Sequence, residues 1–192
     1  MVEGVDRVVV TGTPGTGKTT VSEEVARQLG FETVHLNQMV EEREYVLGYD
    51  SDRETAVTDV EALREELEDE REVVIEGHLS HYLEADHAVV LRCRPDVLAR
   101  RLLDRGYDDG KVRENAESEA LDVVLAEALE EHDVYEVDTT DLEPDEVVEE
   151  VVEGVRNQRE RHGEVDWSEF VEGVDVEALH EGDEEAKPRG EG

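Results

Sequence analysis

The chain has 192 residues, of which 55 are acidic and 19 are lysine or arginine, so its formal net charge is -36. This length suits one domain with a real hydrophobic core, and the negative charge excludes nonspecific nucleic-acid binding, which needs a basic surface. The lone cysteine, Cys93, excludes an intramolecular disulfide, and no apolar run suits a signal peptide or membrane span, so we expect a soluble, cytoplasmic protein.

The predicted elements begin with a strand at 7–11, a glycine-rich loop and a helix at 18–29. The loop reads Gly12-Thr-Pro-Gly-Thr-Gly-Lys-Thr19 and fits the phosphate-loop pattern G-x-x-x-x-G-K-[ST]. In such a loop, backbone N–H groups and the N-terminus of the new helix face phosphate oxygens. We expect Lys18 against the β- and γ-phosphates of a nucleotide and the Thr19 hydroxyl in a Mg²⁺ shell. A chance glycine-rich turn is the alternative, and the flanking strand and helix argue against it.

The next stretch suggests a pocket for a second substrate. The pattern predicts a strand at 33–36, a helix that Asn37 caps and that ends near Gly48, and a loop at 49–53. Extra length here usually means an inserted lobe, whose side chains could contact a base, a ribose and a phosphate. The candidates are Asn37, Tyr45, Tyr49, Asp50 and Arg53. Packing of the loop explains the same residues equally well.

The rest of the chain continues the alternation of helices and strands. Its predicted elements are a helix capped by Asp59, a strand at 73–75, a helical turn at 79–83, a strand at 88–91, a helix opened by Pro95 and stopped by Gly106, a helix at 112–130 with Leu121, Val124, Leu125 and Leu129 inward, a strand at 134–137 and a helix opened by Pro144. Five alternating strands predict an open parallel α/β sheet. Trp167 and Phe170 could anchor a short helix, and 181–192 reads as a solvated tail.

The third strand ends in Glu76-Gly77-His78, at the sheet edge where ligands of open α/β sheets bind. Glu76 could hold a Mg²⁺-bound water or orient an attacking one, and His78 could hydrogen-bond a phosphate or a water. The alternative is that Glu76 caps the following turn and His78 is a partly exposed strand-end residue. His81 and His87 have no such placement, so we expect them at the surface; Cys93 should be a buried structural thiol.

Arginines gather after the fourth strand. An arginine fork binds two oxygens of a transferring phosphoryl group, whereas a surface ion pair is worth under about 1 kcal/mol and is the ordinary alternative in so acidic a chain. The candidates are Arg100, Arg101, Arg105 and Arg113. Arg105, directly before Gly106-Tyr107, is the best placed of them for a mobile loop that closes over a substrate.

The acidic residues are spread over every predicted helix, and only three lysines occur, at 18, 111 and 187. Three interpretations compete: an acidic disordered protein, a partner for basic proteins, and adaptation to high salt. The apolar residues are patterned, which argues against global disorder. Molar salt shortens the screening length to about 3 Å, and this favours the high-salt interpretation because it makes such self-repulsion tolerable.

Four segments together resemble the adenylate kinase isoenzyme 6 family, small nucleoside monophosphate (NMP) kinases of archaea and eukaryotic nuclei. The segments are 12–20, 48–50, 101–107 and 111–119. The resemblance covers about 5–161 and implies a P-loop NTPase fold with a five-stranded parallel sheet, an NMP-binding region at about 33–55 and a lid at about 104–114. It leaves an acidic extension at 162–192, expected to be partly disordered. The residues that it implies in ATP contact are Gly15, Gly17, Lys18, Thr19, Thr20 and Arg105.

The same resemblance implies two activities, phosphorylation of AMP or another NMP by Mg²⁺-ATP and hydrolysis of ATP. It also implies a role in late maturation of the small (30S) ribosomal subunit and its 16S rRNA, through transient contact with ribosomal protein uS11. Two departures stand out. Ordinary adenylate kinases carry Asp-Gly-x-Pro-Arg after strand three, whereas this chain has Glu76-Gly77-His78-Leu79 without that arginine, and Glu76 stands where many relatives have Asp. An ATPase assembly factor with little kinase activity, and a shikimate- or gluconate-type metabolite kinase, are the alternatives.

Overall fold

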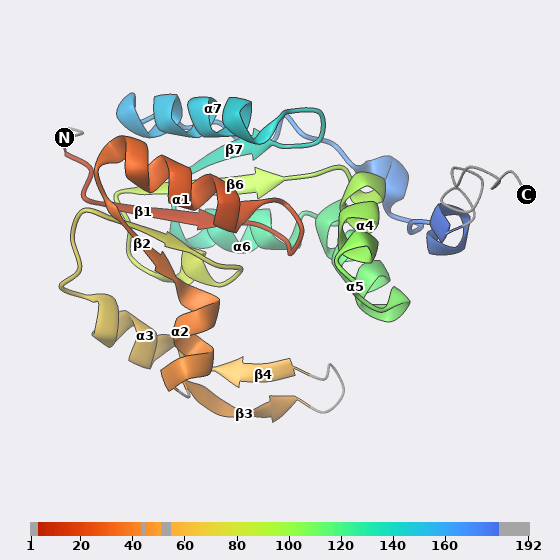
Figure 1. Cartoon of the computed structure of the whole chain (residues 1–192), viewed down its shortest axis with the longest axis horizontal. Helices are drawn as coiled ribbons and strands as arrows, with labels where there is room; N and C mark the ends of the chain where they lie inside the picture. The colour runs from red at the N-terminus through yellow and green to blue at the C-terminus, as the bar shows by residue number, and fades with distance from the viewer. Residues whose placement is uncertain (1–3, 44, 51–54, 181–192) are drawn as a thin grey trace, which may run out of the picture.

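The computed structural model describes residues 4–43, 45–50 and 55–180. Five parallel strands form one sheet in the order β2-β5-β1-β6-β7, which confirms the predicted fold class (Figure 1). Their bounds are Arg7–Thr11 for β1, Glu32–His35 for β2, Val73–Glu76 for β5, His87–Arg92 for β6 and Val134–Asp138 for β7. Because the strands are parallel, their carboxyl ends meet at one edge of the sheet, where ligands of such sheets bind.

Helices cover both faces of the sheet. Their bounds are Lys18–Leu29 for α1, Leu36–Arg43 for α2, Val60–Leu67 for α3, Ser80–Tyr82 for the 3₁₀ helix η1, Pro95–Asp104 for α4, Asp109–Ala120 for α5, Val123–Glu131 for α6, Pro144–Arg156 for α7 and Ser168–Phe170 for the 3₁₀ helix η2. Strand alternation divides the core: Val8 and Val10 pack with α1 and α7, whereas Val9 packs with α3 on the other face. Asp59 caps α3 as predicted, accepting from the Ala62 N–H at 3.1 Å.

A β-hairpin occupies the stretch where the sequence predicted the end of a helix and a loop. The helix α2 ends at Arg43, not near Gly48, and β3 (Val46–Asp50) pairs antiparallel with β4 (Thr55–Thr58). The strand β4 is mostly β-branched and β3 contains Val46 and Tyr49, residue types that favour strands, whereas Gly48 is a poor helix former. The helical spacing of apolar residues continues past Arg43, and the predicted helix was therefore too long. Residues 51–54 lie outside the described part of the chain.

The single helix predicted at 112–130 is two helices with a break between them. Asp122, at the break, has a left-handed backbone with φ 54°, and its carboxylate binds the buried guanidinium of Arg92 on β6. An ion pair with a distant strand therefore interrupts a stretch that reads locally as one helix. Of the four residues predicted to face inward, Leu125 is buried and Val124 half-buried, whereas Leu121 and Leu129 are 49% and 38% exposed.

Beyond residue 161 the chain folds back along the body (Figure 1). The short helix predicted near Trp167 and Phe170 is η2, which lies against α5. A second helical turn at 176–180 buries Val176, 1% exposed, in a cluster with Leu98 and Leu102 of α4 and with residues of α5. The predicted tail at 181–192 lies outside the described residues. Within the described residues, no helix has the length and apolar character needed to cross a bilayer.

Candidate functional site

The phosphate loop connects β1 to α1 at the carboxyl edge of the sheet. Gly12 and Gly15 have φ values of 141° and 99°, in the region that favours glycine. A Cβ on Gly12 would collide with the carbonyl oxygen of Leu91, and one on Gly15 would lie 2.9 Å from Cδ1 of Leu98 on α4. The loop thus fits closely between β6 and α4, and Gly12 and Gly15 are required by space as well as by backbone conformation.

Lys18 is held inside this loop, with 8% of its surface exposed. Its Nζ donates to the carbonyl oxygens of Gly12, at 2.9 Å, and Thr13, at 3.1 Å. Burial lowers the pKa of Lys18 to about 8, against the opposing attraction of Glu76 and Glu119. A phosphate would offer this ammonium a stronger, charged acceptor than either carbonyl. The loop therefore keeps its cation in place for an anionic ligand.

Thr19 and Glu76 lie side by side next to the lysine. The Thr19 hydroxyl donates to Oε1 of Glu76 at 3.4 Å, and Nδ1 of His35, on β2, hydrogen-bonds the same oxygen at 3.0 Å. Glu76 is 5% exposed and is the last residue of β5. A hydroxyl and a carboxylate suit Mg²⁺, which prefers oxygen ligands and completes its shell with phosphates and water. Among the described residues no group of three or more His, Cys, Asp or Glu side chains could hold a metal unaided.

His78 and Asn37 line the same cavity, whose volume is about 200 Å³. Nδ1 of His78 donates to Oδ1 of Asn37 at 3.1 Å, and burial, followed by the nearby Lys18, lowers the pKa of the imidazole. The prediction that Asn37 caps a helix is wrong, because α2 already begins at Leu36 and the side chain turns to His78 instead. Besides the loop residues Gly15, Gly17 and Thr20, the structure thus brings these predicted residues to one cavity: Lys18, Thr19, Asn37, Glu76 and His78.

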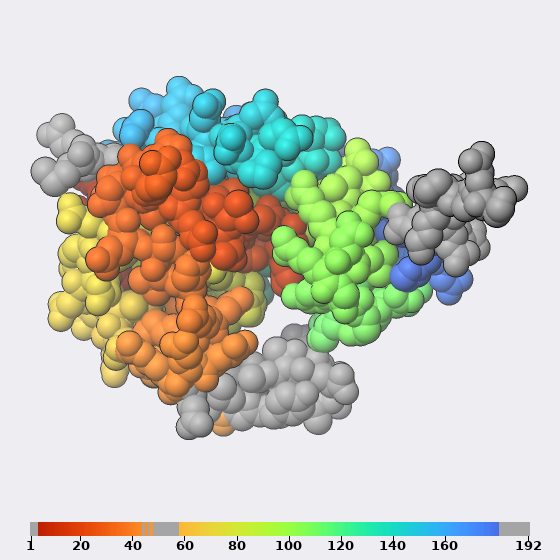
Figure 2. Space-filling model, viewed as in Figure 1, coloured from red at the N-terminus to blue at the C-terminus, as the bar shows by residue number. Residues whose placement is uncertain are grey.

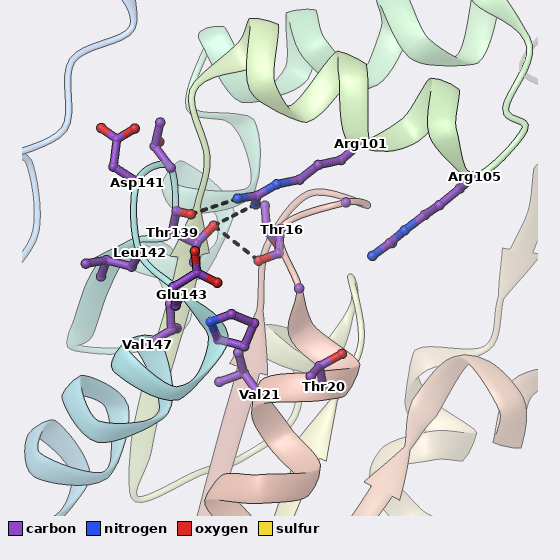
Figure 3. A pocket seen from close by; sticks show the side chains of 14 residues that line it. Thr16, Thr20, Val21, Arg101, Arg105, Thr139, Asp141, Leu142, Glu143 and Val147 are labelled. Atoms are coloured by element: carbon purple, nitrogen blue, oxygen red, sulfur yellow. Dashed lines mark hydrogen bonds between the residues drawn. The ribbon is translucent and has the colours of Figure 1, made fainter. Parts of the chain in front are cut away.

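Arg105 reaches this cavity from the opposite side. It follows the last turn of α4 and extends toward the phosphate loop (Figure 3), and its guanidinium makes no hydrogen bond or ion pair with any residue that the structure describes. Figure 2 shows the surface of the loop segment (red) between that of α1 and α2 (orange) and that of α4 and α5 (green). Arg113 lies elsewhere, 3.9 Å from Glu177, and Arg100 lines neither this cavity nor the larger one beside it.

A larger cleft of about 500 Å³ adjoins the loop (Figure 3). It is lined by Gly15, Gly17 and Thr20, by Arg101 and Arg105, and by the segment 139–144 after β7. Arg101 donates to Oγ1 of Thr139 at 3.1 Å and to its carbonyl oxygen at 2.9 Å, which fixes one wall of the cleft. Thr139 and its neighbours are not among the site residues predicted from the sequence. Their place at the end of a parallel strand was the signal that could have found them.

The remaining residues predicted to bind a second substrate are not among the described residues that line either cavity. Tyr49 and Asp50 belong to β3, beside α2 in Figure 1, and Arg53 lies outside the described residues. Their assignment stays a prediction.

The expectation of surface positions for His81 and His87 is wrong. They are 0% and 6% exposed. Nδ1 of His81 hydrogen-bonds Oγ1 of Thr11 at 3.0 Å, and its Nε2 lies 3.4 Å from Oε2 of Glu127. His87 begins β6 at the opposite edge of the sheet from the cavity. Cys93 is buried as predicted, and burial raises the pKa of its thiol to about 12, so it is inert.

A family model and several known proteins match more than half of this chain. A family model described as "AAA domain" matches residues 8–122. Proteins described as "Putative adenylate kinase" are similar to most of the chain: that of Natronomonas pharaonis is 48% identical over 86% of this chain and 99% of its own length, and that of Methanocaldococcus jannaschii is 39% identical over 85% and 93%. That of Halobacterium salinarum is 44% identical over 86% and 99%.

Solved structures show the same fold at low sequence identity. Shikimate kinase from Acinetobacter baumannii in complex with shikimate has a TM-score of 0.62 and 15% identity, covering 82% of this chain and 96% of its own. Shikimate kinase from Aquifex aeolicus has a TM-score of 0.52 and 21% identity, covering 79% and 97%. At these identities the likeness concerns the P-loop kinase fold alone.

Proposed function

The chain belongs to the family of archaeal proteins described as "Putative adenylate kinase", and we propose that it transfers the γ-phosphoryl group of ATP to AMP, giving two ADP. One observation carries this proposal. Two cations from opposite sides, Lys18 of the phosphate loop and Arg105 at the end of α4, face one cavity beside the Thr19 hydroxyl. Phosphoryl transfer depends on such placement, because its catalysis is mainly positioning and stabilisation of negative charge.

ATP would lie across both hollows of the site. Its phosphates would take the loop N–H groups of Gly15, Gly17 and Thr20, while Lys18 exchanges its carbonyl acceptors for phosphate oxygens. The nucleoside would occupy the larger cleft, against Thr139. A phosphate oxygen of AMP would then attack the γ-phosphorus while the bond to the β–γ bridging oxygen breaks. Arg105 would stabilise the charge spread over the transferring group.

Mg²⁺ is the metal ion that the proposed reaction needs, and it would neutralise phosphate charge where it is bound. Thr19 would hold it directly and Glu76 through a water, since these two oxygen-bearing side chains already lie together. His35, on the same carboxylate oxygen, would limit the rotation of Glu76.

We also propose that 33–55 forms the AMP-binding region and 104–114 the lid. Asn37, which lines the cavity, supports the first assignment, with Tyr49, Asp50 and Arg53 as further candidates in the same region. Arg105 and Tyr107 support the second, because both line the cavity from the connection between α4 and α5. Closure of this connection would exclude water from the transferring phosphoryl group.

Hydrolysis of ATP is the second activity that we propose. Glu76 and His78 would orient a water for attack when no AMP is bound, and the support is their shared position on the cavity beside Lys18. A cycle of this kind could drive binding to and release from ribosomal protein uS11 during maturation of the small ribosomal subunit. The charge of -36 suits a basic partner, although molar salt would screen much of the attraction.

A coupled assay in molar KCl tests the kinase proposal, with ADP formation from Mg²⁺-ATP measured with and without AMP. We expect AMP to accelerate ADP formation, with one AMP consumed for each ATP and two ADP formed. If AMP changes nothing and is not phosphorylated, the kinase proposal fails, and ADP formed without AMP then supports the ATPase alternative. Shikimate and gluconate, as alternative acceptors, should stay unphosphorylated. For the uS11 proposal, a pull-down with purified uS11 decides: absence of binding both with and without ATP would contradict it.

A further inference from the structure

A buried carboxylate links the phosphate loop to the helix that follows Arg105. Glu119 lies on α5, 2% exposed. Its Oε2 accepts from the hydroxyl of Thr13, the second residue of the loop, at 2.5 Å. Its Oε1 accepts from Nε of Arg92 at 2.8 Å and from the backbone N–H of Cys93 at 3.1 Å. Oε2 therefore binds the phosphate loop, whereas Oε1 binds the end of β6.

Thr13 is in turn the residue around which the loop is organised. Its carbonyl oxygen accepts from Nζ of Lys18 at 3.1 Å, from the Thr16 hydroxyl at 2.9 Å and from the Thr16 N–H at 3.3 Å. The side chain of Thr13 has one hydrogen-bond partner among the described residues, the carboxylate of Glu119. The position of the Lys18 ammonium thus depends on a peptide unit that Glu119 holds.

The carboxylate of Glu119 is itself fixed. Arg92 is 1% exposed and donates to Oε1 of Glu136 at 2.5 Å, to the carbonyl oxygen of Glu119 at 3.3 Å and to Asp122. A buried charge is costly unless it is paired and hydrogen-bonded, and here the guanidinium satisfies that condition from the side away from the loop. Oε2 of Glu119 is therefore left for Thr13.

We propose that Glu119 is a positioning residue for phosphoryl transfer: through Thr13 it holds the phosphate loop in its nucleotide-binding shape and ties that shape to α5. This inference rests on the proposed kinase function. A buried ion pair that only stabilises the fold would need Glu119 and Arg92 alone. The bond from Oε2 to the loop is the feature that such a role leaves unexplained.

The test compares T13V with T13S in the full chain, in molar KCl. Valine has nearly the shape of threonine but no hydroxyl, whereas serine keeps the hydroxyl and loses only a methyl group. Since a hydrogen bond to a charged group contributes roughly 1.5–3 kcal/mol, we expect T13V to raise KM for ATP at least about tenfold. KM for AMP should not change, and T13S should behave as the natural chain does.

A comparison of kcat with the KM values distinguishes a positioning role from a loss of stability. Partial unfolding of T13V would lower kcat through the active fraction and leave both KM values unchanged, and that result would overturn the proposal. So would an unchanged KM for ATP. E119Q, which removes the charge and weakens the same bond, should also raise KM for ATP, and the double variant T13V/E119Q should be no worse than the stronger single variant. Additive effects of the two substitutions on KM for ATP would show that Glu119 does not act through Thr13.

If the natural chain itself fails to phosphorylate AMP, the proposed function fails instead. ATP binding by T13V and T13S, measured by calorimetry, then still tests the inference.

Discussion

The imidazole of His78 donates from Nδ1 to Oδ1 of Asn37, 3.1 Å away, and so joins the end of β5 to the first turn of α2. Burial lowers the pKa of the ring, which is therefore neutral near pH 7. With the proton on Nδ1, Nε2 is left as an acceptor that could bind a water. In the proposed hydrolysis reaction, this geometry would give His78 a role that it need not have in transfer to AMP.

Substitution of His78 by alanine should accordingly lower ATP hydrolysis about 100-fold, the usual scale for loss of a base, and lower transfer to AMP much less. N37A should also lower ATP hydrolysis, but by less, because the imidazole of His78 stays in place and loses only the hydrogen bond that orients it. The two rates are measured in the coupled assay without and with AMP. Equal losses in both reactions would argue against a water-positioning role.

Substitution of Lys18 should remove activity and lower the free energy of unfolding only slightly. K18A should abolish both transfer and hydrolysis, since Lys18 is the only lysine among the described residues that line the cavity. The pKa of about 8 in the folded protein, against 10.5 ordinarily, means that the fold disfavours the charged ammonium at pH 7. The free energy of unfolding of K18A by urea should therefore not fall below that of the natural chain by more than the two lost hydrogen bonds, about 1–3 kcal/mol. Retained turnover would contradict the site assignment.

Arg105 and Arg113 form a matched pair for the role of the lid. R105A should lower kcat for transfer to AMP about 100-fold, the loss typical of one group that stabilises transition-state charge. R113A removes an exposed arginine 3.9 Å from Glu177, an ion pair worth less than about 1 kcal/mol, and should leave kcat within about twofold. Similar kcat values for the two variants would show that Arg105 does not stabilise the transferring phosphoryl group.

His81 makes the stability of the protein depend on pH. Burial, with His132 and His78 as smaller causes, lowers the pKa of His81 from 6.5 to about 4. Between these values the unfolded chain binds the proton and the folded chain does not, so the free energy of unfolding falls as the pH falls from 6.5 toward 4.

We expect the natural chain to lose up to about 2 kcal/mol more than H81Q between pH 7 and pH 5, measured by urea unfolding in molar KCl. Other titrating groups, the many carboxylates included, are the same in both chains and cancel in the comparison. Identical slopes of unfolding free energy against pH would show that His81 does not titrate in this way.

Much of the site could be predicted because its signals are local. The strand, the glycine-rich loop and the helix around Lys18 are contiguous, and the requirements of a phosphate cradle act on consecutive residues. The same holds for Glu76 and His78, which end a strand, and for Arg105, which ends a helix before a glycine. The alternation of strands and helices was enough for the sheet, because parallel strands need crossover helices.

Other features depended on side chains that meet only in the folded chain. The break at Asp122 follows from an ion pair with Arg92, and the helical spacing of apolar residues does not reveal this ion pair. His81 is buried because η1 packs against β1 and α6, elements that are distant from it in the sequence. The assignment of 139–144 to the large cleft required the placement of β7 beside β6.

By itself, the sequence determined the phosphate loop, the sheet that presents it and the sign and size of the charge, because these depend on adjacent residues or on composition. Only the tertiary structure decided which groups support the loop. Glu119 is 106 positions from Thr13, and their contact exists because α5 packs where the carboxyl ends of β1 and β6 meet. Contacts at such separations depend on the whole packing of the chain, so local patterns cannot reveal them.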